Sequence, residues 1–352
     1  MEEIVALIAL SRLPGVKNIV KKGVAEGHEK ISPLFEGKVK TDDEALNIAI
    51  RAFKGWKEIE RDLGFLKRMG ATPISIKEKD YPEMLREIPD APVILYKIGE
   101  RQINRDAIAI VGSRKATWEG RNLAERIANT LSSMGITVVS GLARGIDAAA
   151  HAGSLEEKGG TIAVMGSGTD ICYPSENRWL YERIREKGVI LTEYSPGERP
   201  YPSHFPERNR LIAGLSKGVL VIEASQKSGS LITARLGLEY GREVMAVPGS
   251  IFNEMYSGAN RLIKDGARLV SEINDIITTC FPDLPLKLID SQESELDKEE
   301  GHIYALIGFD KIHVDEVIEK SRMEPGAVMA VLTRLEMKDA IRSIPGGYYI
   351  RR

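Results

Sequence analysis

The residues best suited to bind an anion lie in short loops that are rich in glycine and serine and accompanied by arginine. The first loop spans residues 112–117, the second spans 140–147, and the third is the Gly-Ser-Gly-Thr-Asp segment 166–170. Small residues let backbone amides approach a ligand closely, and a neighbouring arginine can bind a phosphate through two hydrogen bonds. These loops therefore predict phosphate recognition.

Two further segments carry cations beside polar groups. Residues 205–210 include two arginines that flank an asparagine, which we expect at a junction between a loop and a helix. Residues 225–233 place Lys227 beside two serines; helix capping explains one serine but not the lysine. The alternative for the two arginines is an ordinary surface position, with one of them paired with Glu207.

The candidate binding residues supply amides, hydroxyls, side-chain amides or cations from these segments. They are Gly112, Ser113, Arg114, Ser140, Gly141, Arg144, Gly166, Arg208, Asn209, Arg210, Lys227, Ser228, Gly229 and Ser230.

No catalytic or metal-binding group stands out. Asp147 and His151 are spaced by one helical turn and could form an acid-base pair, but no nucleophile or metal ligand accompanies them. Asp147 is better explained as a residue that caps a helix or interacts with its dipole. The two cysteines, Cys172 and Cys280, form neither a disulfide framework nor a zinc motif. The sequence thus predicts no metal and no cofactor.

Nucleotide-binding motifs are absent from the sequence. Loop 112–117 lacks the Gly-x-Gly-x-x-Gly spacing, and the third loop has Cys172 and Tyr173 where further glycines are needed. No Gly-x-x-x-x-Gly-Lys-Ser/Thr occurs anywhere in the chain. Nicotinamide and ATP chemistry are therefore disfavoured.

The elements that must position these loops follow a regular alternation. Short apolar runs, which indicate buried strands, alternate with amphipathic stretches of helical length; the runs are 107–111, 136–139, 161–165, 189–191, 219–222 and 244–247. This pattern predicts an α/β domain with a doubly wound, mostly parallel sheet over about 104–277. The binding loops would then follow the carboxyl ends of the strands, where ligands bind in such sheets.

The flanking regions have different textures. Residues 1–92 are patterned as a helical hairpin, a longer helical stretch and a connector with four prolines. Residues 281–300, which begin with Phe-Pro-Asp-Leu-Pro and continue into the polar, acidic stretch 290–301, predict a linker. Residues 301–352 predict three short helices and a β-hairpin, which is the winged-helix pattern. The predicted domains are therefore 1–92, 93–280 and 301–352.

Composition limits the class of protein. The 352 residues are 43% hydrophobic, which is enough for a sizeable core, and the net charge of -2 gives no global basic field. Any nucleic-acid site must be local. The sequence offers neither a secretory leader nor an apolar run of membrane-spanning length, so we expect a cytoplasmic protein without a membrane role.

Taken together, the loop motifs closely resemble the DprA family, also called Smf, over essentially the whole middle domain. The resemblance rests on residues 112–114, 140–147, 166–177, 205–216, 223–224, 228–231, 233–234, 241–242 and 246–249.

The resemblance implies a single-stranded DNA-binding protein and not an enzyme. Family members have an extended Rossmann-like domain that dimerises, protect incoming single strands during natural transformation, and hand them to the recombinase RecA. The family's DNA pocket would map here onto Ser113, Arg114, Arg144, Arg208, Arg210 and Lys227. The resemblance favours sequence-independent binding, and the terminal regions match in general character only.

For the predicted homodimer, we expect the contact at Leu262 and Ile263, on the helix 257–264, which we take as the last helix of the α/β domain. The alternative is that both residues pack on the sheet. Tyr173, Tyr201 and Phe205 are candidates for stacking on bases.

Alternatives remain open from the residues alone, which do not distinguish DNA from RNA. One rival is a nucleotide-cleaving phosphoribohydrolase of the LOG type, although the only Pro-Gly-Gly lies at 345–347, in the predicted wing. Another is a transcription regulator that binds through the C-terminal domain, whose charges nearly balance. The N-terminal region is SAM-like or helix-hairpin-helix-like, but Lys17 occupies the position of an expected glycine, so a protein-interaction role is equally open.

Overall fold

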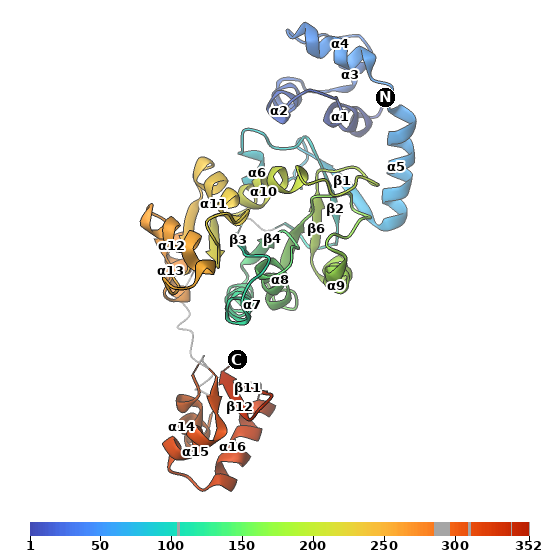
Figure 1. Cartoon of the computed structure of the whole chain (residues 1–352). Helices are drawn as coiled ribbons and strands as arrows, with labels where there is room; N and C mark the ends of the chain where they lie inside the picture. Colours follow the sequence, from blue (N-terminus) through green and yellow to red (C-terminus); the bar gives the residue numbers. More distant parts are fainter. Residues whose placement is uncertain (104–105, 285–295, 309–310, 339, 352) are drawn as a thin grey trace. The chain divides into compact units, whose positions relative to one another are not determined.

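The computed structural model describes residues 1–103, 106–284, 296–308, 311–338 and 340–351. The chain divides into two units, Met1–Leu284 and Pro285–Arg352, which are described separately (Figure 1). Most of the predicted linker lies outside the described residues.

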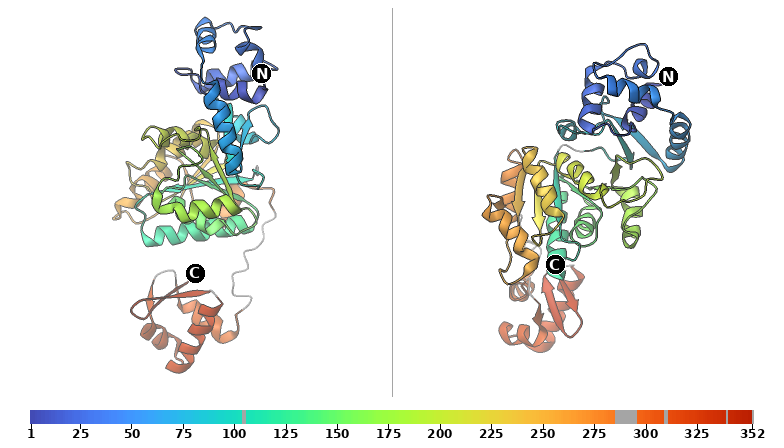
Figure 2. Two further views of the ribbon diagram at one scale, coloured as in Figure 1. Left: turned by 90° about the vertical axis from the view of Figure 1, so that its right-hand side faces the viewer. Right: turned by 45° about the horizontal axis from the view of Figure 1, so that its top comes forward.

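The first unit begins with five helices, and the first two form the predicted hairpin (Figure 2). The Asp43 side chain accepts hydrogen bonds from the amides of Ala45 and Leu46 and so starts α4. Leu7, Ile59 and Leu66 are buried between these helices and the sheet. The five helices are α1 (Glu3–Ser11), α2 (Asn18–Gly27), α3 (Ser32–Phe35), α4 (Glu44–Ala52) and α5 (Trp56–Met69).

The proline-rich connector contains a strand that the sequence analysis missed. Strand β1 (Ala71–Ser75) precedes the short helix α6 (Glu83–Arg86) and pairs antiparallel with β2 (Ile94–Ile98). Pro73 is tolerated because β1 is the edge strand of the sheet, where one side of the backbone needs no partner. The connector is therefore part of the sheet.

The predicted doubly wound, mostly parallel sheet is confirmed. It has nine strands in the order β1-β2-β6-β5-β4-β3-β7-β8-β9, and β3 through β9 run parallel to one another. All six predicted apolar runs form strands. The seven strands that follow β2 are β3 (Ala107–Gly112), β4 (Thr137–Ser140), β5 (Thr161–Val164), β6 (Val189–Thr192), β7 (Gly218–Ile222), β8 (Glu243–Ala246) and β9 (Arg268–Leu269).

Helices cover both faces of the sheet (Figure 1). Along β3, Ala107, Ala109 and Val111 face the core beneath α10 and α11, whereas Ile108 and Ile110 face the core beneath α7, α8 and α13. The helices are α7 (Trp118–Ser133), α8 (Ile146–Ser154), α9 (Arg178–Lys187), α10 (His204–Gly214), α11 (Ser230–Glu239), α12 (Ser257–Lys264) and α13 (Ile273–Cys280), with 3-10 turns at Ser175–Asn177 and Glu254–Tyr256. Because α13 follows α12, the prediction that 257–264 is the last helix of this domain was wrong.

The second unit has the predicted winged-helix order. Its helices are α14 (Lys298–Leu306), α15 (Val314–Ser321) and α16 (Pro325–Met337), and its strands are β10 (Ile312–His313), β11 (Ile341–Ile344) and β12 (Tyr348–Arg351). Asp297 and Glu300 form a capping box at the start of α14, so the last residues of the predicted linker belong to a helix. The acidic residues at the end of the predicted linker therefore cap the start of a helix.

Candidate nucleic-acid interface

The predicted binding segments gather at one edge of the sheet. Strands β3, β4, β5, β6 and β7 are parallel, so their carboxyl ends share this edge. Loops 112–117, 140–145 and 166–173 follow β3, β4 and β5, and loop 223–229 follows β7. Helix α10 follows β6 at the same edge. These loops and the start of α10 therefore lie together where ligands bind in such sheets. Several of the loop amides are already engaged within the protein: those of Ser113, Gly141 and Ala143 donate to Glu223 O and to the Asp147 carboxylate.

The loops after β3, β4 and β7 are joined through their backbones. The Ser113 amide donates to Glu223 O at 2.7 Å, and the Ile146 amide donates to Ser113 O at 3.2 Å. Gly145 has a φ of 77°, and a Cβ there would collide with Ser113 O, so only glycine fits this approach. The hydroxyl of Ser113 accepts from the Lys115 amide at 3.0 Å.

The Arg114 side chain is exposed, and its guanidinium carbon lies 5.4 Å from the centre of the Phe205 ring. Arg144 is also exposed, and it pairs with the exposed Glu176. Lys227 is exposed in loop 223–229, after β7. These three cations come from the loops after β3, β4 and β7, and within the described residues neither Arg114 nor Lys227 makes an ion pair.

Arg208 lies beneath the loops and not on their surface. It is 3% exposed, and its guanidinium donates to the carbonyl of Val164. It also packs so closely under Gly141 that a Cβ there would overlap the guanidinium. Burial lowers the pKa of Arg208 to about 10. The structure therefore places Arg208 as a support for loop 140–145.

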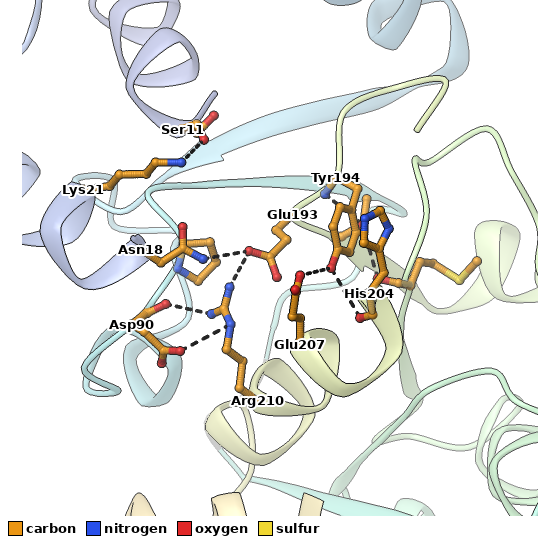
Figure 3. A network of polar contacts seen from close by, with 12 residues as sticks. Ser11, Asn18, Lys21, Asp90, Glu193, Tyr194, His204, Glu207 and Arg210 are labelled. Atoms are coloured by element: carbon orange, nitrogen blue, oxygen red, sulfur yellow. Dashed lines mark hydrogen bonds and ion pairs between the residues drawn. The ribbon is translucent and has the colours of Figure 1, made fainter. Parts of the chain in front are cut away.

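Arg210 faces the opposite way, towards the N-terminal helices (Figure 3). It is 6% exposed, pairs with Glu193, and donates to Asp90 O at 2.8 Å. Asn18 of α2 donates to the same Glu193 at 3.3 Å, so this network joins α10 to the helical region. Burial raises the pKa of Glu193, and the arginine opposes this effect.

The remaining polar candidates divide between the surface and the interior. Asn209 is half-buried and donates to Gly229 O at 3.4 Å, which links α10 to loop 223–229. The hydroxyls of Ser228 and Ser230 lie 2.7 Å apart. Ser140 is fully buried and donates to Ile110 O at 2.6 Å, so its hydroxyl ties two strands together.

Aromatic rings flank the cationic loops. Phe205 lies against Gly166, and its ring centre is 5.2 Å from that of Tyr173, which is 45% exposed. Tyr201 is 53% exposed and contacts His204 edge-on. All three stacking candidates from the sequence therefore lie on the segments after β5 and β6.

Asp147 and His151 do not form an acid-base pair with each other. Asp147 accepts from the amides of Gly141 at 3.1 Å and Ala143 at 3.4 Å. His151 accepts from the Leu142 amide at 3.2 Å, and its other ring nitrogen lies 2.7 Å from the Thr161 hydroxyl. Burial lowers the pKa of His151 to about 3 and raises the pKa of Asp147. Both residues hold the loop after β4.

The sequence analysis names one supporting residue, Glu223, only as part of a motif and gives it no role. Glu223 is fully buried at a φ of 48°, and its carboxylate accepts from the Thr117 amide at 2.8 Å and from the Thr117 hydroxyl. It thereby joins the loop after β7 to the start of α7. The sequence offered one indication of this role, which is an acidic residue directly after the apolar run 219–222.

Other site classes find no support in the described part of the chain. No group of three histidine, cysteine or acidic side chains is placed to hold a metal ion there. Among the same residues, no helix has the length and apolar character needed to cross a membrane.

The sequence and the fold are both similar to proteins of one kind. Residues 72–281 match the family of DNA recombination-mediator protein A, and residues 290–347 match the DprA winged helix domain. The chain is 45% identical over 204 residues to the DNA processing protein DprA of Streptococcus pneumoniae, covering 58% of this chain and 72% of that protein. It is 38% identical over 303 residues to protein Smf of Escherichia coli, covering 83% and 80%.

Two of the solved structures to which the chain is similar are of DNA processing proteins. The X-ray structure of DNA processing protein A from Streptococcus pneumoniae has a TM-score of 0.67 and 35% identity, over 79% of this chain and 98% of that one. The Helicobacter pylori protein, whose structure concerns a single-stranded DNA binding mode, has a TM-score of 0.56 and 28% identity, over 61% and 97%.

Proposed function

Because the chain belongs to the DNA recombination-mediator protein A family, also called DprA or Smf, we propose that it binds single-stranded DNA without sequence preference. It protects the strand and loads the recombinase RecA onto it during natural transformation or recombination. In this proposal the protein acts in the cytoplasm, as a homodimer and without catalysis.

The observation that carries the proposal is the position of three exposed cations on loops at one edge of the sheet. Arg114, Arg144 and Lys227 follow β3, β4 and β7 at this edge. Arginine and lysine at such an edge bind phosphates, and phosphates carry no sequence information. Contacts of this kind account for binding that is independent of sequence.

The aromatic rings favour a single strand over a duplex. Bases of a single strand are free to stack on side chains, whereas bases of a duplex are already stacked on each other. Tyr173 and Phe205 lie beside Arg114, so a ring surface and a phosphate donor are within reach of the same nucleotides. The Helicobacter pylori relative supports this preference, since its structure concerns single-stranded DNA.

Homodimerisation is proposed through Leu262 and Ile263 of α12. Both are half-buried and contact the core from the side of the sheet near β8. Their remaining exposed surface could join a symmetric contact, in which the same patch of both copies is buried.

We propose that the protein is not a catalyst because its candidate acid and base have structural roles. Asp147 and His151 are engaged by loop amides, and the Pro-Gly-Gly of a LOG-type enzyme is found only in the turn between β11 and β12. A nucleotide-cleaving reaction would need an acid or a base that can contact the substrate, whereas these two side chains bond to amides of the loop after β4.

The proposal is tested by measuring the affinity of the purified chain for a single-stranded oligonucleotide and for the duplex of the same sequence at one salt concentration. We expect clear preference for the single strand and similar affinity for unrelated sequences. Lys67→Ala, at an exposed cation on α5, is the matched control for Arg114→Ala. Equal affinity for the duplex, or release of the base from nucleoside monophosphates, would contradict the proposal.

A further inference from the structure

An apolar turn projects from the sheet edge next to the cationic loops. Ile251 and Phe252 lie between Ser250 and Asn253, and they are 84% and 93% exposed. The Asn253 amide donates to Ser250 O at 3.1 Å, which closes the turn with these two residues at its tip. Small and polar residues normally occupy such positions, so large apolar side chains there call for a binding partner.

The turn is held firmly by the residues that flank it. Asn260 of α12 donates to Gly249 O at 2.9 Å and accepts from the Gly249 amide at 3.1 Å. The Asn253 side chain accepts from the Met255 amide at 3.0 Å. Because both ends of the turn are fixed, Ile251 and Phe252 project from a defined position, which lowers the entropy lost on binding.

The turn forms one block with the proposed phosphate-binding loops. The Gly258 amide at the start of α12 donates to Ala224 O at 2.7 Å, directly before the segment that carries Lys227. Burial, together with a hydrogen bond to the Glu223 carboxylate, raises the pKa of the Tyr256 hydroxyl to about 12. The same carboxylate accepts from the Thr117 amide at 2.8 Å, behind Arg114.

The order of strands sets the spacing along this edge. Strands β3, β7 and β8 are consecutive neighbours. Adjacent strands lie about 4.8 Å apart, so the loops after β3 and β8 begin about 10 Å from each other. Three steps of a strand in B-form DNA, at about 3.4 Å each, cover that length, so a single strand of three nucleotides is long enough to span it. The loop that carries Phe252 therefore starts within a few nucleotides' length of the loops that carry Arg114 and Lys227.

We propose that Phe252, supported by Ile251, is a base-stacking platform that extends the single-strand site beyond the loops after β3 and β7. This inference rests on the proposed function. It assigns to the turn a nucleobase as its ligand, because a base presents a flat apolar face and every base has one. The platform therefore adds affinity while keeping the binding independent of sequence.

The test compares an oligonucleotide of deoxythymidines with an abasic oligomer of equal length, using the full-length chain. Phe252→Ala should weaken binding to the thymidine strand about tenfold or more, while its affinity for the abasic strand equals that of the wild type. Phe252→Trp should retain wild-type affinity. Ile48→Ala, which removes an exposed apolar side chain from α4, is the control and should bind both strands normally.

A second readout reports stacking directly. A 2-aminopurine placed in the thymidine strand should lose fluorescence when it stacks on Phe252 of the wild type. The loss at that position of the strand should be smaller with Phe252→Ala. Equal affinities of Phe252→Ala and wild type for the thymidine strand, or an equal loss on both strands, would overturn the platform.

Two further outcomes would refute the platform for distinguishable reasons. If Phe252→Ala changes the sedimentation of the protein but not its preference for bases, the turn is a protein contact and not a base-stacking surface. If the wild type fails to bind the thymidine strand, the proposed function itself fails, and the platform fails with it.

Discussion

At the scale of single residues, the four arginines of the site divide by burial. Arg114 and Arg144 are exposed, whereas Arg208 and Arg210 are 3% and 6% exposed and bond to protein groups. An exposed cation can reach a phosphate with little reorganisation. Removing a buried cation from its protein partners costs several kcal/mol of free energy. We therefore expect Arg208 and Arg210 to stabilise the fold and not to bind a phosphate.

Arg208→Ala should therefore destabilise the fold. The change removes the donor to Val164 O and the cation near Asp147, so this buried carboxylate keeps its amide donors but loses its neighbouring positive charge. We expect the free energy of unfolding to fall by about 3 kcal/mol, measured by urea denaturation. Arg144→Ala is the control and should unfold at the wild-type urea concentration. A wild-type midpoint for Arg208→Ala, with weakened DNA binding, would make Arg208 a ligand contact.

His151 should make stability depend on pH. Burial lowers its pKa from 6.5 to about 3, so the unfolded chain binds a proton below pH 6.5 that the folded chain does not. Stability is therefore lost as the pH falls from about 6.5 towards 3, by up to about 1.4 kcal/mol per pH unit. The buried Asp147, whose pKa is raised, acts in the opposite direction, so the effect is read as a difference between variants.

The measurement is urea unfolding of the wild type and of His151→Asn between pH 7 and pH 4. The wild type should lose stability more steeply than the variant. His28→Asn, at a half-exposed histidine, is the control. Parallel curves for the wild type and His151→Asn would refute the assignment.

The sequence names the candidate residues, whose binding to DNA stays a prediction, but it does not give the direction in which their side chains point. Arg208 and Arg210 are two positions apart, and on a helix such residues point to different sides. Because both lie inside α10 and not at its junction with a loop, one supports loop 140–145 and the other bonds to Glu193. Motif spacing alone does not contain that information.

At the scale of elements, the parallel strands place four loops along one edge, and side chains between the loops keep them in register. Glu223 joins the loop after β7 to Thr117, and Asn209 joins the same loop to α10. The six predicted strands were recognisable because strands buried on both faces form continuous apolar runs. Strand β1 was hidden by Pro73, which a sequence pattern cannot assign to an edge.

For helix α12, we expect Ile263→Arg to yield a folded monomer. A charged side chain would be buried unpaired in a symmetric contact twice, once from each copy. Sedimentation measures the mass, and circular dichroism checks the fold. Lys264→Ala, at an exposed neighbour on the same helix, is the control. A dimer that persists in the Ile263→Arg variant would remove this face from the interface.

At the scale of the whole molecule, the site is a local cationic feature on a chain with a net charge of -2. The candidate cations all lie in the first unit, Met1–Leu284. A protein without a global basic field attracts a polyanion only through such a local group, so a few side chains should account for most of the salt dependence of binding.

The most direct test of the account is therefore the slope of log affinity against log salt for a single-stranded oligonucleotide. Replacing Arg114, Arg144 and Lys227 together with alanine should reduce the magnitude of the slope by about 2, because each phosphate contact contributes about 0.7. The melting temperature should stay at the wild-type value. Alanine at the exposed Lys54, Lys57 and Lys67 is the matched control and should leave the slope unchanged. An unaltered slope in the first variant, or a loss of melting temperature that accounts for its weaker binding, would contradict the assignment of these loops to the DNA.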